Sequence, residues 1–159
     1  MKVYRWLLGL LAAVGLGVAL SFFYPKQAMS QTHSEAIAAA RQIMDDFMTT
    51  FNARDEEAWA GTFHYPHIRI ASGDVRIADS AEVVMAEMDF ALFAEMTGWH
   101  YSAWDSIQVV QAGSDKVHFS VEFTRFNEEG EPLRTYQSLY VVTKRGDRWG
   151  VQARSSFAP

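Results

Sequence analysis

Four long stretches of alternating apolar and polar residues lie near the C-terminus, in residues 101–157: YSAWDSIQVVQAGSDKVHFSVEFTRFNEEGEPLRTYQSLYVVTKRGDRWGVQARSSF. Such alternation is typical of strands that bury one face. The strands that we predict span residues 101–112, 116–126, 133–144 and 148–157. Short turns containing Gly113, Gly130 and Gly146 separate them, as expected for an antiparallel sheet.

The residues before this segment indicate helices. Apolar side chains recur at three- and four-residue steps, which predicts a helix with one buried stripe: Ile37, Ala40, Met44, Phe47 and Phe51. Thr32 and Glu35 fit a capping box, so we expect this helix to begin at Thr32. Residues 52–55 interrupt the pattern, and Asp55 can cap a short second helix through Trp59.

Between the second helix and the long strands, the sequence predicts two short strands and a third helix. The strands are expected at 67–70 and 75–77, around a turn at 71–74. The third helix is expected to start near Asp79 and to end at Gly98, because glycine readily adopts the left-handed cap conformation. Helices followed by antiparallel strands predict an α+β fold in one domain, residues 31–159.

Turn lengths predict which side chains share a face of the sheet. If each turn contains an odd number of residues, odd-numbered positions stay together across all four strands. That face is strongly apolar and should contact the helices. Its polar exceptions are Asp105, Arg125, Thr135, Gln137 and Ser155. Buried polar groups need partners or water, so we expect either an Asp105–Arg125 ion pair or a cavity in which these groups hold part of a ligand.

The cavity alternative predicts binding of a small apolar or amphipathic molecule. The ligand-binding residues that we predict are Trp59, Tyr65, Trp99, Phe119, Phe123, Arg125, Gln137 and Ser155. The even-numbered face contains aromatic side chains and an arginine: Trp104, His118, Glu122, Phe126, Tyr136, Tyr140 and Arg154. Such a composition suits either an association surface, which predicts a homodimer through the outer sheet face, or a solvated face.

Residues 1–30 have the three parts of a secretory signal peptide. Lys2 and Arg5 give a basic start, residues 6–23 are uncharged and mostly apolar, and Ala28 and Ser30 precede a possible cleavage site. The apolar stretch also approaches the length of a membrane span. We therefore expect a periplasmic or secreted protein, or alternatively one anchored to the inner membrane by residues 6–23. Membrane association is expected only if the leader is uncleaved.

Charge and composition exclude several classes of function. The whole chain has a net charge of −5, and removal of the leader with Lys2, Arg5 and Lys26 lowers it to −8. Nucleic acid is a poor candidate, because phosphate binding requires clustered basic residues. There is no cysteine, and no phosphate-binding glycine motif occurs. We predict no cofactor and no metal site, since His64, His67 and His100 lack the usual spacing of zinc ligands.

The order of elements resembles the nuclear transport factor 2-like superfamily, which includes ketosteroid-isomerase-like and polyketide-cyclase-like domains. Residues 51–55 with Ala58 and Trp59 resemble the bend between that family's first two helices, and residues 146–151 resemble its closing strand. The resemblance implies a cone, in which a curved antiparallel sheet wraps around three N-terminal helices and leaves an apolar pocket. The fold hosts isomerases, dehydratases and cyclases as well as binding proteins.

Catalysis is a separate hypothesis. In isomerase-like members of the superfamily, an aspartate before a proline often serves as general base, but this chain has Tyr65 before Pro66. The remaining acid–base candidates are His64, His67, His100 and Asp105. Three functions therefore stay open. They are a binding domain for a small molecule, a lyase or isomerase acting on a hydrophobic carbonyl compound, and a dimeric interaction domain.

Overall fold

The structure is a computed structural model that describes residues 26–71 and 73–159, with side chains from His33 onward. Its helices are α1 (Lys26–Ala53), α2 (Glu56–Gly61), α3 (Ala81–Glu87) and α4 (Phe90–Thr97). Its strands are β1 (Phe63–Ala71), β2 (Asp74–Ala78), β3 (Tyr101–Ala112), β4 (Lys116–Phe126), β5 (Pro132–Arg145) and β6 (Arg148–Ser156). The predicted α+β class is confirmed.

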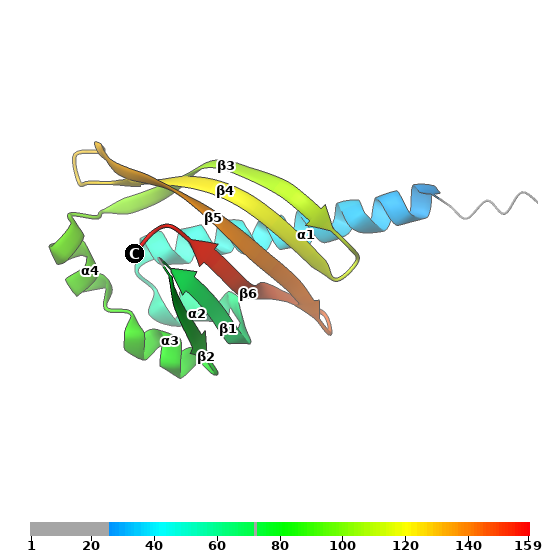
Figure 1. Cartoon of the computed structure of the whole chain (residues 1–159), viewed down its shortest axis with the longest axis horizontal. Helices are drawn as coiled ribbons and strands as arrows, with labels where there is room; N and C mark the ends of the chain where they lie inside the picture. The colour runs from blue at the N-terminus through cyan, green and yellow to red at the C-terminus, as the bar shows by residue number, and fades with distance from the viewer. Residues whose placement is uncertain (1–25, 72) are drawn as a thin grey trace, which may run out of the picture.

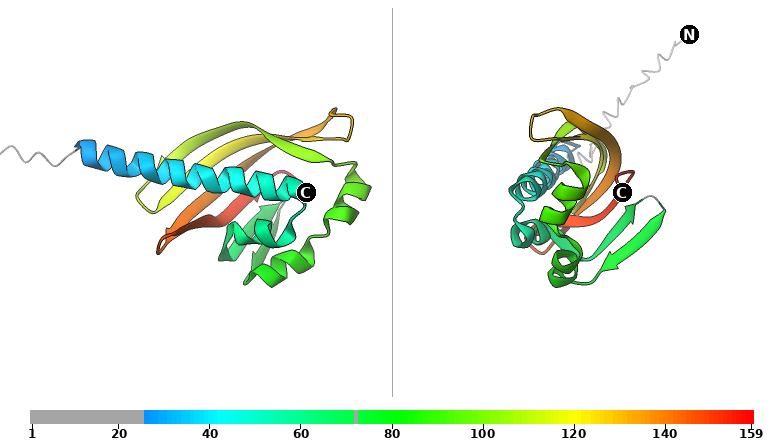
Figure 2. Two further views of the ribbon diagram at one scale, coloured as in Figure 1. Left: turned by 180° about the vertical axis from the view of Figure 1, so that it is seen from behind. Right: turned by 90° about the vertical axis from the view of Figure 1, so that its left-hand side faces the viewer.

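All the strands form one six-stranded sheet in the order β2-β1-β6-β5-β4-β3. Neighbouring strands are antiparallel except for β1 and β6, which are parallel. The sheet is curved, and α1 lies across its concave face (Figures 1 and 2). Helices α3 and α4 lie at the end of the sheet near the C-terminus (Figure 1). This arrangement gives the cone that the resemblance implied.

Helix α1 begins six residues earlier than the capping box predicted. Thr32 is inside the helix, so it does not start it. Nothing in residues 26–31 breaks a helix, and Pro25 directly precedes it, a place where proline is well tolerated. Of the predicted leader, residues 1–25 lie outside the described residues. Its remaining residues, 26–30, belong to α1. None of the helices in the described part of the chain is long and apolar enough to span a membrane.

The predicted third helix is two helices. Met88 has extended backbone angles, and the Asp89 carboxylate accepts a hydrogen bond from the backbone N–H of Leu92. Asp89 therefore caps a new helix, α4, because aspartate satisfies a free N–H of a first turn. Gly98 ends α4 with a φ of 70°, and Asp55 caps α2, both as predicted. The structure thus has four helices among the described residues, where the sequence predicted three.

Bulges change the predicted alternation of side chains in the sheet. The registers of β3, β5 and β6 shift at four residues: Asp105, Val110, Leu133 and Gln152. Each extra residue exchanges inward and outward positions beyond it. The prediction holds on β4, where Val117, Phe119 and Val121 are buried. It is wrong on β5, where Leu139 is exposed and Tyr140 is buried.

The core lies between α1 and the concave face of the sheet. Phe47 of α1 is its centre, with its ring within about 6.4 Å of the rings of Phe51, Trp59, Phe63, Trp104 and Tyr140. Trp99, after α4, closes one end of the core and donates a hydrogen bond from Nε1 to Ser102. The aromatic contacts of Phe47, which are stacked, tilted or edge-to-face, add to the stability gained from burial.

Candidate functional site

A cavity of about 230 Å³ lies between α1, the concave face of the sheet, α3, α4 and the C-terminus. Its wall is mostly apolar and includes Phe47, Phe51, Phe63, Trp104 and Phe123. An apolar cavity of about 150 Å³ accommodates benzene, so this one has room for a substituted ring. The sheet and helices therefore leave a hollow in the molecule, as the cavity alternative predicted.

Three arginines lie side by side on the inner face of the sheet. Arg76 of β2 pairs with Arg69 of β1, which in turn pairs with Arg154 of β6. We call these three residues the arginine row. All three line the cavity, and Arg76 is exposed whereas Arg69 and Arg154 are half-buried. The row therefore extends from the rim of the cavity into its interior.

The arginine row exists because β1 and β2 turn their polar residues inward. Ile70 of β1 and Val75 and Ile77 of β2 are 42%, 63% and 61% exposed, on the outer face. His67 and Arg69, which alternate with Ile68 and Ile70, line the cavity. A strand that covers an ordinary apolar core would have the opposite polarity. The part of the cavity wall formed by β1 and β2 is therefore polar.

A fourth arginine comes from the other half of the sheet. Arg125 of β4 lines the cavity and is only 9% exposed. Its guanidinium lies 4.8 Å from the ring centroid of Phe93 and 4.9 Å from that of Tyr136. Arg154 is held similarly, 5.4–5.6 Å from the ring centroids of Phe47, Trp59 and Phe63. Cation–π contacts hold these two side chains in place without neutralising their charge.

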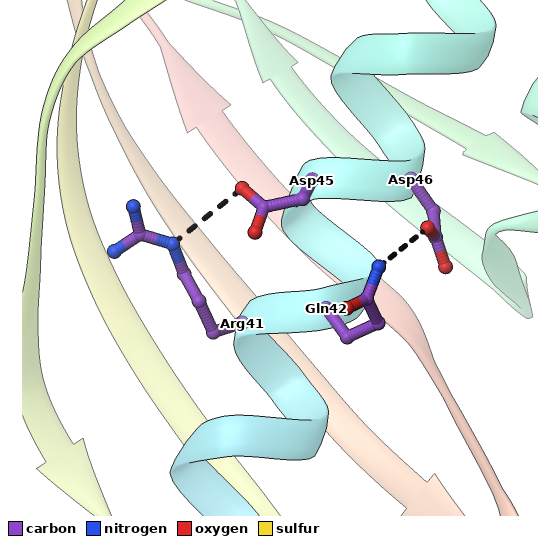
Figure 3. A network of polar contacts seen from close by, with 4 residues as sticks. All are labelled: Arg41, Gln42, Asp45 and Asp46. Carbon is purple, nitrogen blue, oxygen red and sulfur yellow. Dashed lines mark hydrogen bonds and ion pairs between the residues drawn. The ribbon is translucent and has the colours of Figure 1, made fainter.

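None of the four arginines forms an ion pair with a described residue. Among the described residues, an ion pair joins Arg41 to Asp45 at 3.5 Å, on the surface of α1 and away from the cavity. It lies beside the hydrogen bond from Gln42 to Asp46 (Figure 3). Glu87 is the acidic side chain in the cavity wall, and neither Glu87 nor the last residue, Pro159, which also lines the cavity, forms an ion pair with a described arginine. The cavity therefore has a marked excess of positive charge.

The positive charges influence one another. Burial, and then the charges of Arg154, Arg76 and Arg125, lower the pKa of Arg69 to about 10. Burial also lowers the pKa of Arg125, with a smaller contribution from Arg154. Like charges on paired strands are destabilising, and desolvation adds to the cost. The cavity is electrostatically strained in the absence of a negative charge.

His67, a residue of the cavity wall, has one unpaired ring nitrogen. The Nδ1 atom lies 3.2 Å from the carbonyl oxygen of Val151, so Nδ1–H is the donor and Nε2 carries the free lone pair. The side chain is 3% exposed, and its ring stacks on Phe63 at 4.2 Å. Burial, followed by the charge of Arg154, lowers the pKa of His67 to about 3. His67 is therefore neutral at pH 7.

Several buried polar atoms of the cavity wall have no hydrogen-bond partner among the described residues. They are the Nε–H groups of Arg125 and Arg154, the indole N–H of Trp104, and Nε2 of His67. Buried polar atoms are normally paired, and an unpaired one is costly. Three of these four atoms are donors. The polar residues of the wall therefore carry more unpaired donors than acceptors.

The other predicted acid–base residues lie away from the cavity wall. His64 is buried, and its Nδ1 lies 2.9 Å from Oγ1 of Thr143. Burial, together with Arg148 and Arg145, lowers the pKa of His64 to about 4. His100 is exposed, and its ring packs edge-on against Tyr101. The structure does not bring the three histidines together.

Asp105 faces away from the cavity. It is the extra residue of the first bulge in β3. Trp104 lies opposite Phe123, and the odd-numbered Asp105 is not on the inner face on which it was predicted. The exposed Asp105 carboxylate accepts a 2.7 Å hydrogen bond from Thr124 on the outer face. The predicted Asp105–Arg125 ion pair is therefore wrong, because the two side chains point to opposite faces of the sheet.

Two of the eight predicted ligand-binding residues, Phe123 and Arg125, line the cavity. Trp59, Trp99 and Phe119 are core residues outside its wall. The remaining three are turned elsewhere: Tyr65 donates to the carbonyl of Ala60, while Gln137 donates to Glu122 and Ser155 is exposed. The bulges in β5 and β6 exchange the inward-facing and outward-facing positions. The odd-numbered Gln137 and Ser155 therefore face outward.

The same bulges explain the polar residues that sequence reasoning missed. Trp104, Tyr140 and Arg154, predicted on the outer face, line the cavity instead. Burial raises the pKa of the Tyr140 hydroxyl, against the opposing effect of Arg154. Arg69 and Arg76 did have a sequence signal, since each alternates with isoleucine or valine in a short strand. In the described part of the chain, no three His, Asp or Glu residues are grouped as metal ligands would be.

Several solved structures have the same fold. An NTF2-like protein with a cystatin-like fold from Novosphingobium aromaticivorans has a TM-score of 0.67 and 12% identity, over 82% of this chain and 86% of that chain. A ketosteroid isomerase-like protein from Erwinia carotovora atroseptica has a TM-score of 0.57 and 20% identity, over 79% and 98%. A Catenulispora acidiphila protein in complex with S-DNPA has a TM-score of 0.62 and 15% identity, over 78% and 93%.

At these identities the likeness shows the fold alone. No curated protein sequence is significantly similar to the chain. A family model described as NTF2-like protein (DUF6841) matches residues 34–156, which includes α2–α4, every strand of the sheet and most of α1. This match confirms the resemblance that the order of elements indicated. The chain belongs to this family of NTF2-like proteins.

Proposed function

We propose that the chain is a binding domain for a small amphipathic molecule, which occupies the cavity between α1 and the sheet. The observation that carries the proposal is a hollow of about 230 Å³ with an apolar wall and unpaired polar atoms. A recognition site for a small molecule typically combines an apolar wall with a few convergent polar groups. One structural relative, the Catenulispora acidiphila protein, is solved in complex with S-DNPA, which is consistent with a ligand in this fold.

The proposal is tested by measuring thermal stabilisation and calorimetric binding with three single-ring probes: 3-phenylpropanoate, 3-phenylpropan-1-ol and benzyl alcohol. A ligand that binds the native state alone raises the unfolding temperature. We expect at least one probe to stabilise the protein. Ala78→Phe fills the cavity wall with a ring and should abolish the effect, because Ala78 lines the cavity and is 6% exposed.

Ala38→Phe is the matched control, since Ala38 is exposed on α1 and lies outside the cavity wall. The control variant should bind the probes as the unmodified protein does. If no probe stabilises the protein, or if both variants retain binding, the cavity is not the binding site and the proposal fails.

A lyase or isomerase activity on a hydrophobic carbonyl compound is a second candidate. The observation in its favour is the unpaired Nε2 lone pair of His67, a residue of the cavity wall. The pKa of His67, about 3, makes it a weak base at pH 7, which places this candidate second. The test is the exchange of α-protons of 1-phenylpropan-2-one in D₂O, followed by NMR. Protein-catalysed exchange that is lost in His67→Gln would support an enzyme. Exchange at the uncatalysed rate would exclude this use of His67.

A homodimer through the outer sheet face is part of the proposal for this domain. The bulges move Trp104, Tyr140 and Arg154 off the predicted outer face, whereas His118 and Glu122 of β4 stay on it. The exposed apolar residues of the outer face include Ile70, Val75, Ile77 and Leu139. The cross-strand pairs Ile70–Val75 and Leu139–Ser155, with Ile70 paired to Ser155, make these residues neighbours. Contiguous exposed apolar surface of this kind marks interaction sites.

Analytical ultracentrifugation tests the dimer. We expect a dimer that dissociates in the double variant Val75→Lys/Ile77→Lys and persists in Thr49→Lys, which changes an exposed residue of α1. A monomer at all concentrations would contradict this part of the proposal.

Export is proposed from the basic and apolar pattern of residues 1–30. Expression of the full chain in a bacterium, with mass spectrometry of the recovered N-terminus, tests it. A periplasmic product that begins near residue 31 supports cleavage, and a membrane-bound intact chain supports an anchor. An intact chain in the cytoplasmic fraction contradicts export.

A further inference from the structure

We propose that the cavity selects organic acids, and that the carboxylate of the ligand binds the arginine row and Arg125 while a single apolar ring fills the aromatic part. This inference rests on the proposed function, because it names the class of molecule that occupies the same cavity. It goes beyond that function by assigning a charge and a functional group to the ligand.

The first support is the arrangement of charge. Arg76, Arg69 and Arg154 are adjacent across three strands, and each side chain faces the same cavity. A chain with an overall net charge of −5 has thus gathered four arginines where no described carboxylate neutralises them. Unpaired charges are costly to bury, and a bound anion is the group that would offset this cost.

The second support is the set of unpaired donors. Nε–H of Arg125 and of Arg154 and the indole N–H of Trp104 are all buried without partners, and all three residues line the cavity. A carboxylate has about four acceptor positions and matches the planar fork of a guanidinium. Arg125 is more than nine-tenths buried, so it is part of a built site rather than a mobile surface charge.

The third support is the balance between polar and apolar walls. Phe47, Phe63 and Phe123 add an apolar surface to the wall, and Phe47 and Phe63 lie directly beside Arg154. A free inorganic anion would therefore leave most of the wall without contacts. The volume of about 230 Å³ suits one ring with a short side chain. The exposed Arg76 at the rim can attract an anion before it reaches Arg154, since clustered charge concentrates ions of opposite sign.

The experiment compares 3-phenylpropanoate with 3-phenylpropanamide and with acetate, by calorimetry on the protein without residues 1–25 and on the full chain. The amide has nearly the same shape as the acid and lacks its charge, whereas acetate has the charge and lacks the ring. We expect the acid to bind at least tenfold more tightly than either control.

Two variants locate the interaction. Arg154→Met and Arg69→Met should each weaken binding of 3-phenylpropanoate at least tenfold and leave binding of the amide within threefold. Arg69→Met should unfold at an equal or higher temperature than the unmodified protein when no ligand is present, because it removes like-charge contacts with Arg76 and Arg154. Arg41→Met, which removes a surface arginine of α1 (Figure 3), should change neither property.

The outcomes separate the two proposals. If the amide binds as tightly as the acid, or if both cavity variants retain the preference for the acid, the cavity binds small molecules but does not select organic acids. Equal binding of acetate and 3-phenylpropanoate would also overturn the inference, since the ring would then contribute nothing. If none of the three compounds binds, the proposed function fails together with the inference.

Discussion

Arg69 of β1 and Arg154 of β6 lie directly opposite each other on parallel strands, and both side chains face the cavity. Paired strands usually place opposite charges or apolar groups in such positions. Here the neighbour on the other side of Arg69 is Arg76, and the neighbour on the other side of Arg154 is Tyr140. The arginine row therefore lowers the stability of the folded protein at the most polar part of the cavity.

Because the arginines repel one another, we predict that replacing one of them raises the stability of the ligand-free protein. We expect Arg69→Met to raise the free energy of unfolding of the ligand-free protein by about 1 kcal/mol, because burial of an uncompensated charge is relieved. Urea unfolding followed by far-UV circular dichroism measures the change. A loss of more than about 1 kcal/mol would mean that Arg69 has a stabilising partner in solution.

Stability should fall in mild acid because of His67. The pKa of His67 is lowered to about 3 in the folded state, against 6.5 when unfolded. Between these values the unfolded chain binds a proton that the folded one does not, so stability is lost as the pH falls below about 6.5. For His67 this loss is about 2 kcal/mol at pH 5.

Urea unfolding at pH 7.5 and pH 5 measures this effect. The matched variant His67→Gln keeps an N–H for the carbonyl of Val151 and has no titratable group. It should lose about 2 kcal/mol less than the unmodified protein between the two pH values. The same pH dependence in both proteins would show that His67 does not contribute and that other groups, such as His64 with its pKa of about 4, cause the effect.

Phe47 should be among the residues most sensitive to truncation. It is 4% exposed and its ring contacts those of Phe51, Trp59, Phe63, Trp104 and Tyr140. Phe47→Ala is expected to lower the free energy of unfolding by about 3–5 kcal/mol. The control is Phe157→Ala, because Phe157 is 75% exposed and its truncation should cost less than about 0.5 kcal/mol. Equal effects would contradict the position of the core.

Asp105 should not contribute to ligand binding. Its carboxylate lies on the outer face and accepts from Thr124, so Asp105→Asn is expected to leave binding of 3-phenylpropanoate unchanged within twofold. Calorimetry with this variant beside Arg125→Met makes the comparison, and Arg125→Met should lose at least tenfold. A large effect of Asp105→Asn would mean that the bulge at Asp105 does not form in solution.

The sequence predicted the order of elements well because periodicity and capping are local properties. The four long strands, the Asp55 cap and the Gly98 cap all depend on a few adjacent residues. The division at Asp89 was missed because apolar residues continue on both sides of it. The start of α1 was missed because a capping box inside a longer helix has the same sequence as one at its end.

The candidate site was harder to predict because it depends on register. One bulge reverses every later side chain, and the bulges at Asp105, Leu133 and Gln152 have no distinctive residue such as glycine. Parity thus placed Trp104, Tyr140 and Arg154 on the wrong face, while Phe123 and Arg125, on a strand without a bulge, were placed correctly. The pairing of Arg69 with Arg154 joins distant strands, and no local pattern encodes it.

The most direct test of the account is an NMR titration of ¹⁵N-labelled protein with 3-phenylpropanoate, observing the indole N–H signals of tryptophan. Trp104 lines the cavity, whereas Trp149 lies outside its wall. Assignment by Trp104→Phe and Trp149→Phe identifies the two signals. A ligand in the cavity should shift the Trp104 signal in a saturable manner and leave that of Trp149 unchanged. A shift confined to Trp149, or no shift at saturating probe, would contradict binding in the cavity.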